Sequence, residues 1–183
     1  ISSTRAGRNI STKPIMTAGA EGSLRMQEVY LYIEVPSGIK QRKAHSAWRI
    51  VYYCRDGQQA VIGGYPFLDV TPNAAAIITL RLALERLKYG CEVHVWTNNK
   101  LLGAALENGW VKAWAENGWT NRQGKEVANK ALWHRTEWEM RRHQVTGKYI
   151  DSHPAKAEMR KEMKRLDEET KETRQEHPAG AGR

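Results

Sequence analysis

The segment from residue 71 to residue 97 constrains the fold most, because a helix signal is followed there directly by a strand signal. Thr71 and Pro72 favour the N-cap and the first position of a helix. Gly90 is expected to end this helix, since glycine favours the position after a C-cap. Residues 92–97 (EVHVWT) then alternate with the period of a β-strand. An apolar helix followed by such a strand predicts a layered α/β fold.

Three segments upstream of this helix also carry strand patterns. Residues 29–35 alternate, so that one face is aliphatic while Glu34 shares the other face with two tyrosines. Residues 48–54 and 59–65 predict two more strands, joined by an Asp-Gly hairpin turn at residues 56–57. We expect these three strands to pair antiparallel.

Downstream of residue 97 the pattern is mainly helical. Residues 101–139 predict helices interrupted at Gly109, Gly118 and Gly124, and residues 144–150 predict a fifth strand. Strands, helix, strand, helices and strand in this order predict an α/β fold with a five-stranded mixed sheet flanked by helices.

The chain is expected to divide into three parts. Residues 1–27 contain four basic residues without an apolar period and predict a flexible basic arm. Residues 28–151 predict the folded domain, and residues 152–183 predict a charged C-terminal helix and tail. The helix carries a thin apolar stripe of Ala155, Met159, Met163 and Leu166. This stripe predicts a solvated helix with one weakly docked face, and binding of a protein partner is the alternative.

The positive charge is concentrated outside the C-terminal part. The chain has a formal net charge of +9, of which +3 falls on residues 1–27, +6 on residues 28–150 and none on residues 151–183. An excess on the folded part and the leading arm is typical of a protein that binds a polyanion such as nucleic acid. Solubility alone is the alternative explanation.

Several classes of protein are not expected. No apolar run approaches the ~20 residues of a membrane-spanning helix, and the first residues lack the apolar stretch of a signal peptide. Cys54 and Cys91 form no CxxC pair and no histidine shows metal-ligand spacing, so a zinc site is not expected. Buried free thiols in the cytoplasm or another reducing intracellular compartment are the favoured interpretation.

Three stretches, taken in order, resemble the ribonuclease H family. The first is TPNAAA at residues 71–76, which leads into LRLALERLKYGCEVHVWTNN. The second is WVKAWAENGWTNRQGKEVANKALWHR at residues 110–135, which is similar to the family's basic protrusion. The third is HQV at residues 143–145, which is similar to the entry to the family's last strand. The resemblance covers roughly two-thirds of the chain and implies a ribonuclease H-like fold.

The resemblance also implies where a metal site would lie. The family cleaves the RNA strand of RNA–DNA hybrids with two Mg²⁺ ions held by clustered carboxylates, because hard cations take oxygen ligands and need negative charge. Its first three acidic positions fall on Glu34, Ala76 and Asn98 in this sequence. Only Glu34 is an acid, so Glu34 and Asn98 are expected to be a remnant site.

The fourth acidic position has no clear match. Glu158 and Glu162 lie nearby on the last predicted helix, and His153 falls near the family's mobile histidine. We therefore predict no catalytic residue, no bound metal and no cofactor. Mg²⁺ would be needed only if the site proved active.

The binding surface implied by the resemblance is better preserved. Cations neutralise phosphates while aromatic rings pack on sugars or bases. The predicted nucleic-acid-binding residues are Thr71, Asn73, Lys112, Trp114, Trp119, Asn121, Arg122 and Lys125. Of the tryptophans, Trp119 lies in a polar stretch and is expected to be the most exposed. Trp110, Trp114 and Trp133 suit a core position.

Three functions follow as hypotheses. The leading one is a catalytically degenerate ribonuclease H-like module that binds RNA, DNA or a hybrid, as part of a larger assembly. The second is an active metal-dependent hybrid endonuclease with a rearranged site using Glu34, Asn98 and an acid from the last helix. The third is a protein-interaction scaffold that recruits a partner through the C-terminal helix.

Overall fold

The computed structural model describes residues 26–54 and 56–176. The basic arm predicted for residues 1–27 lies outside the described residues except for its last two positions, and so do residues 177–183. The strands are β1 (Gln27–Glu34), β2 (Arg42–His45), β3 (Ala47–Tyr53), β4 (Gln59–Gly64), β5 (Phe67–Val70), β6 (Cys91–Thr97) and β7 (Gln144–Tyr149). The helices are α1 (Pro72–Leu84), α2 (Lys100–Glu107), α3 (Trp110–Glu116), α4 (Lys130–Met140) and α5 (Lys156–Glu176).

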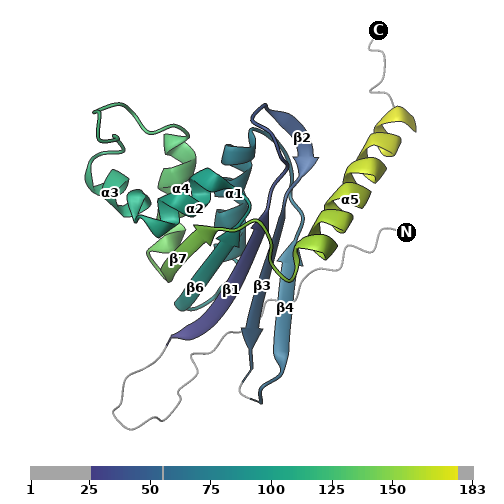
Figure 1. The fold of residues 1–183 in the computed structure, drawn as a ribbon, viewed down its shortest axis with the longest axis horizontal. Helices are drawn as coiled ribbons and strands as arrows, with labels where there is room; N and C mark the ends of the chain where they lie inside the picture. The colour runs from purple at the N-terminus through teal and green to yellow at the C-terminus, as the bar shows by residue number, and fades with distance from the viewer. Residues whose placement is uncertain (1–25, 55, 177–183) are drawn as a thin grey trace.

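Five of the strands form one mixed sheet in the order β4-β3-β1-β6-β7. β1 pairs antiparallel with β3, and β3 pairs antiparallel with β4. β6 pairs parallel with β1, and β7 pairs parallel with β6. The connections from β1 through α1 to β6, and from β6 through α2 to α4 to β7, supply the crossovers that parallel pairs require. The predicted five-stranded mixed sheet flanked by helices is confirmed (Figure 1).

The alternation of β1 sends its side chains to two different cores. Val29, Leu31 and Ile33 are fully buried on the face of the sheet that packs against α1 and α2, and α4 packs on α1. Tyr32 lies on the opposite face, where it joins Met159 of α5 in a second, smaller cluster. Because neighbouring residues of a strand point to opposite faces, Glu34 is placed on the α5 side together with Tyr32.

Helix α5 packs on this second face of the sheet. Ala155, Met159 and Met163 are buried there, which are three of the four residues of the predicted apolar stripe. Asp167 Oδ1 also accepts hydrogen bonds from the backbone N–H and from Nδ1 of His45, both at 2.7 Å, so α5 is anchored to β2. Figure 1 shows the helix running past β2 and beyond the sheet. The stripe is therefore covered by the chain itself.

Two strands and one helix end differ from the sequence expectations. The two-stranded sheet of β2 and β5 was not predicted, because four-residue strands carry too short a pattern. Helix α1 ends at Leu84, with Glu85 as its C-cap, so the prediction that Gly90 ends it is wrong. Gly90 is required for another reason, since a Cβ there would lie 2.8 Å from the carbonyl oxygen of Arg142.

The expectation for the cysteines is met at one position, and the expectation for the helix interruptions is met at all three glycines. Cys91 is a buried free thiol as predicted, whereas Cys54, also a free thiol, is exposed. The expected helix interruptions are confirmed, because Gly109, Gly118 and Gly124 all have positive φ angles. Within the described residues, no helix has the length and apolarity needed to cross a lipid bilayer.

Candidate functional site

The parallel pairing of β1 with β6 places Glu34 beside Asn98. Ile33 lies opposite Thr97 in the ladder, so the two strands end at the same edge of the sheet. Glu34 is the last residue of β1, and Asn98 directly follows β6. The carboxyl ends of parallel strands are where open α/β sheets place their ligands. The predicted neighbourhood of these two residues is thus confirmed.

Both carboxylate oxygens of Glu34 are occupied by cationic or potentially cationic side chains. Oε1 lies 3.0 Å from His153 Nε2, and Oε2 accepts a hydrogen bond of 2.7 Å from Arg160 Nε. The Glu34 side chain is fully buried. The His153 ring is held in place by stacking on Tyr32, with the ring centroids 4.7 Å apart. Glu34 is therefore a buried carboxylate whose charge is compensated from within the protein.

Both ends of the Asn98 carboxamide are also engaged. Its Oδ1 accepts a hydrogen bond of 3.0 Å from the backbone N–H of Val35, and its Nδ2 donates one of 2.9 Å to the Val35 carbonyl. This two-point contact needs one donor and one acceptor, which an amide has and a carboxylate lacks. Asn98 thus fixes the backbone that follows Glu34.

The neighbouring asparagines have structural partners as well. Asn99 caps α2 by accepting a hydrogen bond of 2.9 Å from the backbone N–H of Leu102. Its Nδ2 donates to Asn73 Oδ1 at 2.9 Å, which links α2 to the start of α1. Thr71 caps α1 through a hydrogen bond of 3.3 Å from the backbone N–H of Ala74. Thr71 and Asn73 therefore lie at the edge of the sheet that carries Asn98, and their role in binding nucleic acid stays a prediction.

The other acidic positions considered from the sequence do not add ligands at Glu34. Ala76 is fully buried in the core beneath the sheet. Glu158 accepts a hydrogen bond of 2.7 Å from Arg49, which lowers the pKa of the Glu158 carboxyl. Glu162 is paired with Arg165 at 2.6 Å, and this arginine lowers the pKa of the Glu162 carboxyl. Both acids of α5 are therefore tied to arginines rather than to the end of β1.

A cleft of about 560 Å³ opens at this edge of the sheet. It is bordered by the loop after β1, by the starts of α1 and α2, and by the segment from the end of β7 into α5. Its charged lining residues are Lys100, Lys156, Arg160 and Asp151. Asp151 accepts a hydrogen bond from the Tyr149 hydroxyl, and its backbone carbonyl accepts one from Lys156 Nζ. The cleft is therefore more cationic than anionic.

The protrusion is the second place where predicted residues gather. It comprises α3 and residues 117–129, with an isolated bridge between Thr120 and Glu126. Asn121 builds the tip of this loop, because its Oδ1 accepts hydrogen bonds of 3.0 Å from the backbone N–H groups of Gln123 and Lys125. The side chains of Lys112, Arg122 and Lys125 are exposed on this segment. These three cations are available to a polyanion.

The tryptophans of the protrusion are mainly structural. Trp119 is only 8% exposed, so the prediction that it is the most exposed tryptophan is wrong. Its left-handed backbone, with φ of 65°, turns the ring inward, where it packs edge-on against His134 at 5.6 Å. Trp114 is half-buried and packs on Trp133, which is fully buried, as expected of core residues. The exposed tryptophan is Trp138 on α4, at 65%.

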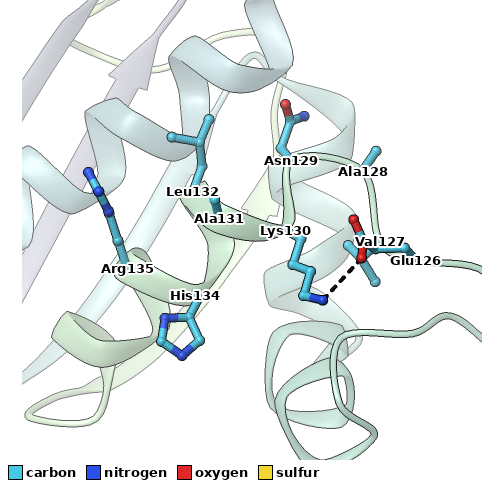
Figure 2. Close-up of a pocket in the computed structure, with 9 residues that line it drawn as sticks. All are labelled: Glu126, Val127, Ala128, Asn129, Lys130, Ala131, Leu132, His134 and Arg135. Carbon is cyan, nitrogen blue, oxygen red and sulfur yellow. Dashed lines mark hydrogen bonds and ion pairs between the residues drawn. The ribbon is translucent and has the colours of Figure 1, made fainter.

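A hollow of about 750 Å³ lies at the start of α4 (Figure 2). Figure 2 shows Lys130 directed toward Glu126, to which it forms an ion pair of 3.0 Å. His134 and Arg135 border the same hollow from the next turn of α4. Its one acid, Glu126, is paired with Lys130, so the hollow adds His134 and Arg135 to the basic surface of the protrusion.

The sequence between residues 27 and 175 matches the family model described as RNase H. This match covers well over half of the chain. The chain belongs to the RNase H family. The resemblance seen in the sequence is thereby confirmed, and the matched region includes nearly all of α5.

Individual RNase H relatives are distant. The ribonuclease H of Nitratidesulfovibrio vulgaris strain Miyazaki F is 30% identical over 106 residues, which cover 58% of this chain and 67% of the relative. Among solved structures, LC9-RNase H1, a type 1 RNase H with the type 2 active-site motif, aligns with a TM-score of 0.61 at 18% identity. That alignment covers 79% of this chain and 72% of the other. LC11-RNase H1 in complex with an RNA/DNA hybrid aligns with a TM-score of 0.52 at 14% identity, over 78% of this chain and 99% of the other. At these identities the structures show the fold alone.

The residues at the family's metal position do not fit a Mg²⁺ pair. Two Mg²⁺ ions need several oxygen ligands that carry negative charge. Glu34 has both oxygens in contact with His153 and Arg160, and the Asn98 oxygen is held by Val35. Across residues 26–54 and 56–176, no three His, Cys, Asp or Glu side chains are grouped as metal ligands would be.

Sequence reasoning missed the cationic side of this RNase H cleft. Arg160 was not considered, although it lies on α5 close to His153 and two acids that were. Lys100 directly follows the Asn-Asn turn, and Lys156 begins α5. Only the position of these three residues in the sequence could have indicated their place in the cleft. The first turns of the helices that follow β6 and β7 must lie at the same edge of the sheet as the strand ends.

Proposed function

We propose that this chain is a nucleic-acid-binding RNase H-like module whose metal site has degenerated. The observation that carries the proposal is the pairing of the Glu34 carboxylate, whose two oxygens contact His153 and Arg160. A guanidinium at 2.7 Å supplies the positive charge that a metal ion would otherwise supply to this carboxylate. Ala76 and Asn98 supply no negative charge at the next two positions.

The nucleic-acid part of the proposal is supported by charge and by family. The exposed cations of the protrusion lie in the segment that resembles the family's basic protrusion. Net charge of +9 favours a polyanion partner. LC11-RNase H1, a structural neighbour, is described in complex with an RNA/DNA hybrid, so a hybrid is the first ligand to test.

The alternative is an active metal-dependent hybrid endonuclease, which the relatives named ribonuclease H favour. In that case Glu34 would have to exchange Arg160 for a metal ion. The described contacts favour the degenerate module, because Glu34 would lose a buried ion pair in that exchange.

Filter binding at low salt tests the proposed function. Labelled RNA–DNA hybrid, duplex DNA, duplex RNA and single strands of one sequence are each titrated with the protein in EDTA and again in Mg²⁺. We expect retention of at least one of these ligands in EDTA; added Mg²⁺ is not required and, as a counterion of the phosphates, should weaken retention. Failure to retain any of them would contradict the proposal.

A further inference from the structure

We propose that the cleft at the ends of β1 and β6 binds a backbone phosphate of the nucleic acid directly through Lys100, Lys156 and Arg160, without a metal ion. This inference rests on the proposed function, because it specifies what the same cleft contacts. It assigns to the remnant metal site a new ligand, a phosphodiester, and a new set of binding residues.

The first argument is the sign of the charge in the cleft. Lys100, Lys156 and Arg160 line it, against the single lining carboxylate of Asp151. A site built from clustered carboxylates repels a phosphate unless metal ions lie between them. Here Ala76 and Asn98 carry no charge, and the remaining acid, Glu34, is fully buried and paired with Arg160, so the exposed charge of the lining is mainly positive. A phosphate can therefore approach without a bridging cation.

The second argument is the geometry of Arg160. Glu34 accepts a hydrogen bond from Nε of Arg160, which is the inner nitrogen of the guanidinium. In the part of the chain that the structure describes, the terminal nitrogens of Arg160 form no hydrogen bond or ion pair that competes with a ligand. The side chain is 44% exposed while Glu34 is fully covered. Glu34 is thus a positioning residue that directs a planar fork, suited to phosphate oxygens, toward the cleft.

The third argument is that the two lysines are held at the same wall. Lys100 Nζ lies 5.6 Å from the centre of the Tyr149 ring. Lys156 donates a hydrogen bond to the backbone carbonyl of Asp151, two residues after Tyr149. Both ammonium groups are therefore fixed near the end of β7, and neither has to be ordered entirely by the ligand.

The volume and shape suit a strand backbone. The cleft is about 560 Å³ and is bordered by segments that follow three adjacent strands of the sheet. Its lining also includes apolar residues such as Pro36, Pro72 and Leu101, which can pack against a sugar. A phosphodiester backbone, which presents charged phosphates between sugars, is the ligand that this combination of cations and apolar residues fits.

The test compares two double variants that each remove two positive charges. Lys100→Gln/Lys156→Gln changes the cleft. Lys161→Gln/Lys164→Gln is the matched control on the exposed face of α5. The affinity of each protein for a labelled RNA–DNA hybrid is measured over a range of KCl concentrations in EDTA.

We expect the cleft variant to lose about tenfold in affinity at low salt and about one unit in the slope of log K against log salt, as for one lost phosphate contact. The control should stay within about twofold of the wild type. Equal behaviour of the two double variants would overturn the inference, while the proposed function would stand if the wild type still bound. A wild type that binds no nucleic acid would instead refute the proposed function itself.

Arg160→Lys supplies an independent check, because it keeps the charge and removes the fork. We expect its affinity to fall several-fold while its salt dependence stays near that of the wild type. If EDTA abolished wild-type binding and Mg²⁺ restored it, a metal-free contact would be excluded.

Discussion

Arg160 Nε lies 2.7 Å from Glu34 Oε2, although 126 positions separate the two residues in the sequence. The contact joins the end of β1 to the second turn of α5 and compensates a carboxylate that water does not reach. The same contact therefore stabilises the fold and occupies the carboxylate that a metal ion would need. In a member of the RNase H family, the same carboxylate position would be the expected place for a metal ion.

Removal of Arg160 should destabilise the fold. We expect Arg160→Ala to lower the free energy of unfolding by about 2 kcal/mol, less than for a wholly buried pair because Arg160 is half exposed. Urea denaturation of Arg160→Ala, Glu34→Gln and the double variant would give the coupling energy between the two residues. Arg165→Ala is the control, since this exposed arginine pairs with two acids on α5, neither of which is buried, and should change stability by less than about 0.5 kcal/mol. Additive effects in the cycle would contradict the predicted coupling.

Much of the fold could be predicted because its strands bury one or both faces. The alternation of residues 29–35 and of EVHVWT fixes their register, since a shift by one residue would expose an aliphatic face. The adjacency of Glu34 and Asn98 then follows from parallel pairing. The partners of Glu34 could not be predicted, because the path of α5 over the second face depends on tertiary packing.

Trp119 shows the same limit on a smaller scale. Its sequence neighbours are polar, yet a left-handed backbone turns its ring into the core. The four-residue strands β2 and β5 have no period long enough to identify, and they are held by each other and by α5. The sequence pattern therefore predicts longer helices and strands well. Whether a single side chain in a turn is buried or exposed depends on the backbone conformation of that turn, which the pattern does not show.

Trp119, which is buried, and Trp138, which is exposed on α4, should respond differently to truncation. Trp119→Ala is expected to lower the free energy of unfolding by about 3 kcal/mol, because it leaves a cavity in the core. Trp138→Ala, on the exposed face of α4, should change it by less than about 1 kcal/mol. Thermal and urea denaturation of the two variants would measure the difference. Similar losses for both would mean that Trp119 is not a core residue.

Acid should destabilise the protein partly through His143. Burial, and to a smaller extent the charge of Arg142, lower the pKa of His143 from 6.5 to about 4, while its Nδ1 accepts a hydrogen bond from the backbone N–H of Cys91. The unfolded chain then binds the proton more readily than the folded one. The stabilisation is therefore complete above about pH 6.5 and is lost as the pH falls toward 4.

His143→Gln isolates this contribution, because glutamine can accept the same hydrogen bond and does not titrate. Between pH 7 and pH 4.5, the wild type should lose about 2 kcal/mol more stability than the variant. Urea denaturation at several pH values would measure both curves. Parallel curves would show that His143 does not carry this dependence.

Restoration of metal binding should require the removal of Arg160 as well as the return of the acids. Ala76→Glu/Asn98→Asp adds two carboxylates but leaves a guanidinium against Glu34, and Asn98→Asp also loses the donor to the Val35 carbonyl. We expect this double variant to be destabilised and to respond weakly to Mg²⁺. With Arg160→Gln added, the melting temperature should rise with Mg²⁺ concentration. Differential scanning calorimetry at increasing Mg²⁺ concentration would measure the melting temperatures of the double variant, the triple variant and the wild type. An equal rise for the double and the triple variant would contradict the role given to Arg160.

The most direct measurement is cleavage of a labelled RNA–DNA hybrid by the purified chain, with Mg²⁺ and with Mn²⁺, at protein concentrations that saturate binding. Because His153 and Arg160 occupy both oxygens of Glu34, we expect the bound hybrid to stay intact with either metal ion. Metal-dependent cleavage that is abolished by Glu34→Ala would contradict the account.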